Sequence, residues 1–169
     1  QMIVFGAVDF TAALVRVAKV LGFRVTVCDA RAVFATHQRF PEADEVVVDW
    51  PDRYLAKVGA DLGSRDAVCV LTHDPKFDVP VLEVALRQPF AYVGAMGSRR
   101  THDDRLARLR EAGLTEAELE RLHSPIGLDL GARTPEETAV SIAAEIIASR
   151  WGGTGRRLGA VGGRIHSAA

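Results

Sequence analysis

The stretch Tyr92-Val-Gly-Ala-Met-Gly-Ser-Arg-Arg100 is the most informative part of this sequence for the fold. The apolar run over residues 90–93 predicts a β-strand, which we expect to break at Gly94 and Gly97. Ser98 stands where the N-cap of a following helix belongs, so the first backbone N–H groups of that helix are expected to stay free. The stretch therefore predicts a strand, a glycine loop and a capped helix in direct succession.

Apolar runs alternate with amphipathic segments along most of the chain. The predicted strands are residues 2–5, 23–28, 45–48, 67–71 and 90–93, and the predicted helices are residues 11–21, 79–86, 100–112, 115–122 and 135–150. Strands that are apolar throughout are typical of a parallel sheet covered on both faces. The pattern predicts a doubly wound, mostly parallel α/β domain of the Rossmann-like, three-layer αβα type. We expect this domain to span residues 1–151, with a glycine-rich basic tail over 152–169.

The composition is that of a soluble globular protein, with 48% hydrophobic and 25% charged residues among 169. A net charge of −1 argues against nucleic acid as the main partner. No run approaches the roughly 20 apolar residues of a membrane span, and no signal peptide is visible. Cys28 and Cys69 lie inside apolar runs, so we expect buried reduced thiols rather than a disulfide or a metal pair. We therefore expect a cytoplasmic protein without a metal site.

Arg99 and Arg100 directly follow the glycine loop. Glycines that allow close backbone approach, an open helix N-terminus and a pair of guanidinium groups predict a receptor for a phosphate or a carboxylate. The alternative is that both arginines pair with acids such as Asp103 and Asp104 at helical spacing.

A second loop, residues 124–138, repeats this arrangement. It carries Gly127, Asp129 and Gly131 and runs into Thr134, an expected N-cap with acids in the first turn after it. Each loop taken alone is also consistent with an ordinary capped chain reversal. Two such loops in one small domain favour a ligand site.

The loop after the first strand, Gly6-Ala-Val-Asp-Phe-Thr11, occupies the place of a dinucleotide fingerprint G-x-G-x-x-G. Only Gly6 matches, and Val8 places a branched side chain where a pyrophosphate would contact the backbone, so we expect weak NAD binding. Asp29 ends the second strand at a spacing suited to a ribose hydroxyl, although it is equally suited to a turn or cap. Arg31 beside it is a candidate for contact with a phosphate.

Thr72, His73 and Asp74 end the fourth strand. A histidine between a hydroxyl and a carboxylate suits a base, an acid or a metal ligand, while Asp74 also suits a helix cap. Because no second histidine stands at ligand spacing, we favour a binding role and predict no catalytic residue. The other histidines, in polar stretches, are expected at the surface: His37, His102, His123 and His166.

Four motifs occur together in this chain: Thr72-His-Asp74, Gly94-Ala-Met-Gly-Ser-Arg-Arg100, Ser124-Pro-Ile-Gly-Leu-Asp-Leu-Gly131 and Thr134-Pro-Glu-Glu-Thr-Ala-Val-Ser-Ile-Ala143. In this order they resemble the C-terminal Rossmann domain of the XdhC/CoxI family, over residues 2 to about 151. The resemblance implies an accessory protein of molybdenum hydroxylases of the xanthine dehydrogenase or carbon monoxide dehydrogenase type. It implies binding of the molybdopterin cofactor, help with its sulfuration, and its insertion into the apoenzyme, with a cysteine desulfurase as a further partner.

Two departures from the family pattern matter. The family's N-terminal domain with a Gly-Gly-Cys segment is missing from this sequence, so we expect the chain alone to lack full maturation activity. Val8 and Asp9 also replace residues usual in the first loop. We favour a non-catalytic cofactor chaperone that forms a homo-oligomer. The alternatives are an NAD(P)-binding oxidoreductase with a degenerate fingerprint and a docking subunit with a vestigial pocket. The predicted cofactor-binding residues are Gly6, Asp29, Arg31, Thr72, His73, Asp74, Gly94, Gly97, Ser98, Arg99, Arg100, Gly127, Asp129 and Gly131.

Overall fold

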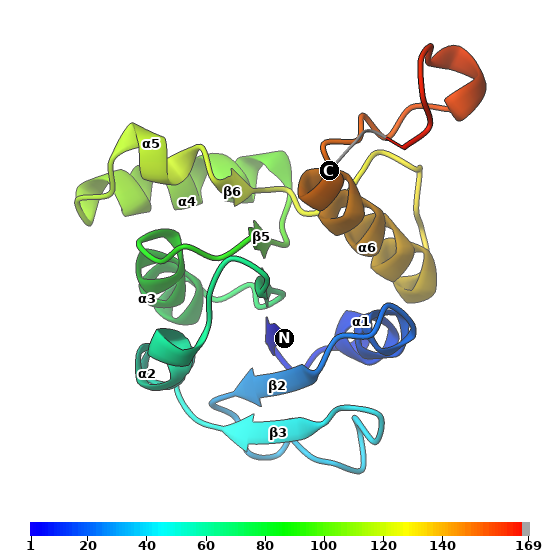
Figure 1. The fold of residues 1–169 in the computed structure, drawn as a ribbon. Coiled ribbons are helices and arrows are strands. Elements are labelled where there is room, and N and C mark those ends of the chain that lie inside the picture. Colours follow the sequence, from blue (N-terminus) through cyan, green and yellow to red (C-terminus); the bar gives the residue numbers. More distant parts are fainter. Residues whose placement is uncertain (167–169) are drawn as a thin grey trace.

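A computed structural model describes residues 1–166 and shows a parallel sheet with helices on both faces (Figure 1). The six strands are β1 (Met2–Phe5), β2 (Val25–Asp29), β3 (Glu45–Val48), β4 (Ala67–Val70), β5 (Tyr92–Ala95) and β6 (Leu122–His123). They lie in the order β3-β2-β1-β4-β5-β6, and every neighbouring pair is parallel. The predicted Rossmann-like fold is confirmed. The strand order reverses between β1 and β4, where folds of this type bind ligands.

The helices divide between the two faces of the sheet. One face is covered by α1 (Asp9–Val20) and α6 (Pro135–Trp151), which lie side by side on the right of Figure 1. The other face is covered by α2 (Pro51–Val58), α3 (Pro75–Leu86), α4 (Arg99–Glu111) and the single turn α5 (Glu116–Leu119). Short 3-10 turns occur at η1 (Gly59–Asp61) and η2 (Leu158–Ala160). No helix within residues 1–166 is both long enough and apolar enough to span a membrane.

Alternate strand residues supply two separate cores, because successive side chains of a strand point to opposite faces. Met2 and Val4 pack with α1 and α6, whereas Ile3 and Phe5 pack with the helices of the other face. Cys69 belongs to the first core and Cys28 to the second, so the sheet separates the two thiols. Both are free and buried, as predicted, and burial raises the pKa of each to about 12.

Two predicted boundaries are wrong near the site. Strand β5 continues through Gly94 to Ala95 instead of breaking at Gly94, because Gly94 pairs with Cys69 and Ala95 with Val70 of β4. Helix α3 begins at Pro75 rather than at residue 79, because Asp74 accepts a hydrogen bond from the Lys76 N–H and Pro75 favours the first helical position.

The helix predicted over 115–122 is present but shorter than predicted. Thr115 and Glu118 form a capping box that starts α5, but the helix lasts only four residues. Arg121 then donates to the carbonyl oxygens of Leu86 and Phe90, and the chain extends into β6 beside β5. These long-range bonds outweigh local helix propensity. Helix α2 was not predicted at all.

Candidate functional site

The loops that follow β1 and β4 touch at the carboxyl edge of the sheet. Gly6 has a φ of +116°, and a Cβ there would lie 2.8 Å from Thr72 Cγ2 and 2.9 Å from the Thr72 backbone nitrogen. Glycine is therefore required at this position both for its conformation and for the close approach of the neighbouring loop.

The loop between β5 and α4 presents an open row of backbone donors. The Ser98 hydroxyl caps α4 by accepting from the Thr101 N–H at 3.1 Å. Within residues 1–166 no acceptor meets the four N–H groups that precede it, those of Gly97, Ser98, Arg99 and Arg100. Free donors at the amino end of a helix form a region of positive potential. The predicted open helix start is present.

Arg99 and Arg100 add positive charge to this row of donors. Both residues are exposed, and neither forms an ion pair with any residue in the range 1–166. Pairing with Asp103 or Asp104, the alternative considered from the sequence, does not occur there. Phosphate binding by these arginines stays a prediction.

Arg105, which was not predicted from the sequence, connects three segments around the start of α4. Its guanidinium donates to Asp78 Oδ2 at 3.0 Å, to the Met96 carbonyl at 2.9 Å and to Ser124 Oγ at 3.3 Å. Asp78 lies on α3, Met96 in the loop between β5 and α4, and Ser124 in the loop that follows β6. The one available signal was the spacing of Arg105 and Leu109, because position 105 faces inward on the same side of α4 as that buried leucine.

The partner of Arg105, Asp78, is equally buried, each with 3% of its surface exposed. Thr72 donates its hydroxyl to the Asp78 carboxylate, which ties the β4 loop to the same pair. Burial raises the pKa of Asp78 to about 6, and the hydrogen bond and charge of Arg105 oppose that shift. Removing one member of such a buried pair leaves the other uncompensated.

A pocket of about 200 Å³ lies between α3 and α4 beside the open helix start. Its lining is mostly polar and comprises His73, Pro75, Asp78, Val79, Thr101, Asp104, Arg105 and Arg108. His73 is exposed, and Asp74 is used to cap α3. The structure thus brings His73 together with the start of α4, but among the described residues it shows no nucleophile–base pair there.

The loop that follows β1 differs because the N–H groups of Ala7 and Val8 already have acceptors. Asp29 accepts from the Ala7 N–H at 2.8 Å, and Thr11 Oγ1 accepts from the Val8 N–H at 3.3 Å. Arg31 binds both oxygens of Asp29, at 2.9 and 2.7 Å. Burial alone would raise the pKa of Asp29, but the bonds from Arg31 and Ala7 outweigh it and lower that pKa. The residues expected to contact a ribose or a phosphate therefore bind each other.

The second predicted loop lies mainly along α6. The Gly127 N–H donates to Glu145 at 3.0 Å, and Ser141 Oγ donates to the Leu128 carbonyl at 2.6 Å. Asp129 and Gly131 are exposed. At the start of α6, Glu137 accepts from the N–H groups of Arg133 and Thr134, at 3.0 and 2.9 Å. This helix start carries its own carboxylate, which disfavours an anion at that position.

His123 was predicted as a surface residue and is instead half-buried in a polar cluster. Its ring stacks on Tyr92 with 4.6 Å between centroids, and its Nδ1 lies 3.6 Å from Glu145 Oε2. The Tyr92 hydroxyl donates to Glu145 Oε1 at 2.5 Å. Burial opposes ionisation of Glu145, but the bonds from His123, Tyr92 and Gly127 together lower its pKa. The cluster anchors the β6 loop to α6.

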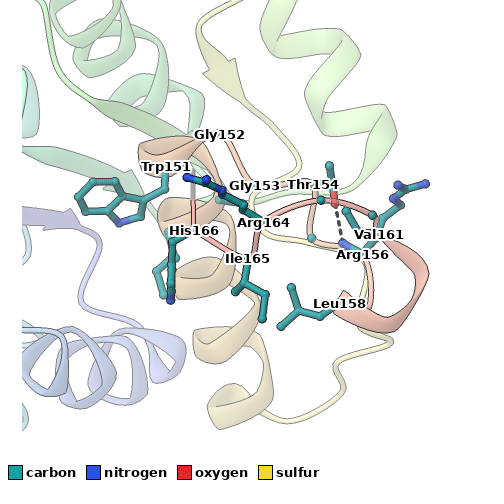
Figure 2. Close-up of a pocket in the computed structure, with 15 residues that line it drawn as sticks. Trp151, Gly152, Gly153, Thr154, Arg156, Leu158, Val161, Arg164, Ile165 and His166 are labelled. Carbon is teal, nitrogen blue, oxygen red and sulfur yellow. Dashed lines mark hydrogen bonds between the residues drawn. The ribbon is translucent and has the colours of Figure 1, made fainter. Parts of the chain in front are cut away.

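A larger hollow, about 390 Å³, lies elsewhere, between the end of α6 and the tail (Figure 2). It is lined mainly by exposed residues of 147–166, none of which was predicted to bind a cofactor. Among residues 1–166 no group of three or more His, Cys, Asp or Glu side chains is arranged to hold a metal ion.

Residues 2–146 match the XdhC Rossmann domain, and this match covers most of the chain. The chain belongs to the XdhC family. It is similar to a probable xanthine dehydrogenase subunit of Bacillus subtilis, with 33% identity over 150 residues, which cover 89% of this chain and 43% of that protein. The family assignment made from the four motifs is confirmed.

Two further similarities bear on the XdhC domain. A protein of Escherichia coli named molybdenum cofactor insertion chaperone PaoD is 35% identical over 99 residues, which are 59% of this chain and 31% of that protein. The crystal structure of a xanthine dehydrogenase from Bacillus halodurans matches with a TM-score of 0.75 and 32% identity, covering 88% of this chain and 43% of that one. The XdhC domain described here spans less than half the length of the relatives that it matches.

Proposed function

We propose that this XdhC domain binds the phosphate end of the molybdenum cofactor at Gly97–Arg100 during cofactor insertion into a molybdenum hydroxylase. One observation carries the proposal. The N–H groups of residues 97–100 lie at the start of a 13-residue helix and have no acceptor within residues 1–166. Arg99 and Arg100 lie beside them and form no ion pair with an acidic side chain of those residues. The similarity to a protein named as a molybdenum cofactor insertion chaperone supports the choice of ligand.

The residues at the start of α4 fit a phosphate group. Backbone donors and the helix dipole favour an anion, and a guanidinium adds charge-assisted hydrogen bonds of roughly 1.5–3 kcal/mol each. The adjoining pocket of about 200 Å³ offers the rest of the cofactor a carboxylate from Asp104 and a hydroxyl from Thr101. When bound, the molybdenum cofactor supplies the redox chemistry of the client enzyme; the XdhC domain holds and orients it.

Sulfuration, by the same proposal, depends on a partner such as a cysteine desulfurase. Cys28 and Cys69 are buried on opposite faces of the sheet, and their raised pKa values keep them protonated at neutral pH. A thiolate is the nucleophilic form of cysteine. This supports a chaperone that does not itself carry sulfur on either residue.

Titration calorimetry with purified molybdopterin tests the proposal. Arg99→Ala combined with Arg100→Ala should weaken binding roughly ten- to a hundredfold while the fold survives. The matched control is Arg24→Ala combined with Arg65→Ala, which removes the same charge before β2 and β4, at the opposite edge of the sheet. Unchanged affinity in a folded Arg99/Arg100 variant, or an equal loss in the control, refutes the site.

An NAD(P)-dependent oxidoreductase remains the second candidate function, because the strand order is that of dinucleotide-binding domains. The hydrogen bonds that the Ala7 and Val8 N–H groups donate to Asp29 and Thr11 count against this function. NADH titrated into the same protein separates the two functions. A low-micromolar dissociation constant for NADH favours the oxidoreductase.

A further inference from the structure

The outer side of α6 carries an apolar stripe whose larger side chains remain well exposed, although the tail lies beside its end. Its members, at positions i, i+4, i+7 and i+11, are Val140, Ala144, Ile147 and Trp151, a spacing that places them on one side of the helix. The exposed fractions are 50% for Val140, 45% for Ile147 and 64% for Trp151. The other side of α6 faces the core through Ala139, Ile142 and Ile146.

The tail enlarges this apolar surface. Leu158 and Ile165 are 65% and 71% exposed, and with Ile147 and Trp151 they border the hollow at the end of α6 (Figure 2). Single exposed apolar residues are ordinary on a protein surface. A continuous row with an adjoining hollow is typical of a protein–protein contact.

The charges along α6 favour a second copy of the same helix, lying antiparallel, as the partner. Glu136 and Glu137 stand at its amino end, whereas Arg150 stands in its last turn and Arg156 and Arg157 follow in the tail. In an antiparallel pair the acidic start of each helix lies beside the basic end of the other. A parallel pair would bring like charges together.

The middle of the stripe also suits close packing of two helices. Ala144 lies there, flanked along the stripe by Val140 and Ile147. The distance between packed helices depends on the size of the side chains at their contact, so a central alanine allows close approach. A two-fold axis through this point would pair identical surfaces, as in most homodimers.

We infer that α6 is the contact surface of a symmetric homodimer, with the stripe of Val140, Ala144, Ile147 and Trp151 buried between two antiparallel copies. The inference rests on the exposure and the charges of α6, and it is independent of cofactor binding.

Sedimentation velocity over a range of concentrations tests this surface. The unmodified chain should dimerise, and Ile147→Glu should raise the dimer dissociation constant roughly a hundredfold or more, because it places a charge in the centre of the contact. The control is Val20→Glu, which changes an apolar residue of α1 that is 85% exposed and off the stripe. A monomer at all concentrations, as expected if another protein covers the stripe, or a dimer insensitive to Ile147→Glu, overturns the inference.

Cysteine cross-linking and charge reversal give independent readouts. Ala144→Cys should form a disulfide-linked dimer under mild oxidation, whereas Ser149→Cys, exposed on another side of α6, should not. The chain's own thiols do not interfere because both are buried. Glu136→Lys and Arg150→Glu should each weaken the dimer, and together they should restore it. Equal cross-linking at both positions, or no restoration, counts against the antiparallel pairing.

Discussion

The loop after β1 (residues 6–8) and the loop after β5 (residues 96–98) both connect a buried strand to a helix at the carboxyl edge of one sheet. They differ in which backbone N–H groups they leave without an acceptor. In the β1 loop, the N–H groups of Ala7 and Val8 are taken by Asp29 and Thr11. In the β5 loop, the N–H groups of residues 97–100 meet no acceptor within residues 1–166. The first resembles a dinucleotide fingerprint in position, but the second is the one that leaves a row of four backbone donors available within residues 1–166.

This difference shows that the number of glycines is a poor measure of a phosphate site. Each loop has one glycine in a positive-φ conformation beside a neighbouring side chain or loop, Gly6 and Gly97. What separates the loops is the fate of the backbone donors, because an anion needs N–H groups that no internal acceptor occupies. Asp29 lies 22 residues from Ala7 in the sequence, so this occupation depends on how the strands are arranged.

The largest effect is expected from removing Arg105, which bonds to the loop after β5 and makes no hydrogen bond to the loop after β1. Arg105→Met should cost about 3–5 kcal/mol of unfolding free energy, since it leaves the buried Asp78 carboxylate unpaired. Urea denaturation measures this. Arg108→Met, an exposed neighbour on α4, should change stability by no more than about 0.5 kcal/mol. A loss below about 1 kcal/mol for Arg105→Met would show that the loop is held by other contacts.

Changing Gly6 tests the contact between the loop after β1 and the loop after β4. Gly6→Ala should destabilise the protein by about 1–3 kcal/mol, because the position has positive φ and its Cβ would press on the Thr72 backbone. Thermal unfolding provides the measurement. Gly63→Ala is the control, since no atom lies within 4 Å of the added Cβ and its backbone is not left-handed. Equal melting temperatures for the two variants would contradict the close approach of the loops.

Acid titration examines how Asp29 holds the β1 loop. The folded-state pKa of Asp29 is lowered from its ordinary value of 3.8, so its stabilisation is present above that value and is lost as pH falls through the folded-state pKa. The stability gap between the unmodified chain and Asp29→Asn should therefore narrow below about pH 4. The free energies of unfolding of both proteins, measured from about pH 7 down to about pH 3, give this difference in stability. The control variant is Asp9→Asn, whose side chain is 93% exposed.

The smallest effect is expected from Val8→Gly. NADH should bind the unmodified chain no more tightly than the high micromolar range, about −5 to −6 kcal/mol. Val8→Gly should improve this by less than about tenfold, because it removes the branched side chain but leaves Asp29 on the Ala7 N–H. Calorimetry with NADH decides the point. A large gain would mean that Val8 alone blocks the nucleotide and that the hydrogen bond from the Ala7 N–H to Asp29 is easily broken.

Local features near the site could be predicted, and contacts between distant segments could not. Ser98 and Thr134 were correctly placed as N-caps, since a cap depends on residues three positions away. The end of β5 was misplaced because Gly94 and Ala95 pair with β4, which comes from a distant part of the sequence. His123 was assigned to the surface because its neighbours are polar, and its partners Tyr92 and Glu145 come from β5 and α6.

By itself, the amino-acid sequence determined the alternation of buried strands and helices, the caps and the family, because these depend on the identity and short-range spacing of residues. The tertiary structure decided which polar groups remain available. Asp29 closes the β1 loop, and Arg105 pairs with Asp78 from 27 residues away beneath the β5 loop. A donor is free only when no acceptor from any other segment reaches it, and only the packed arrangement of all strands and helices specifies that.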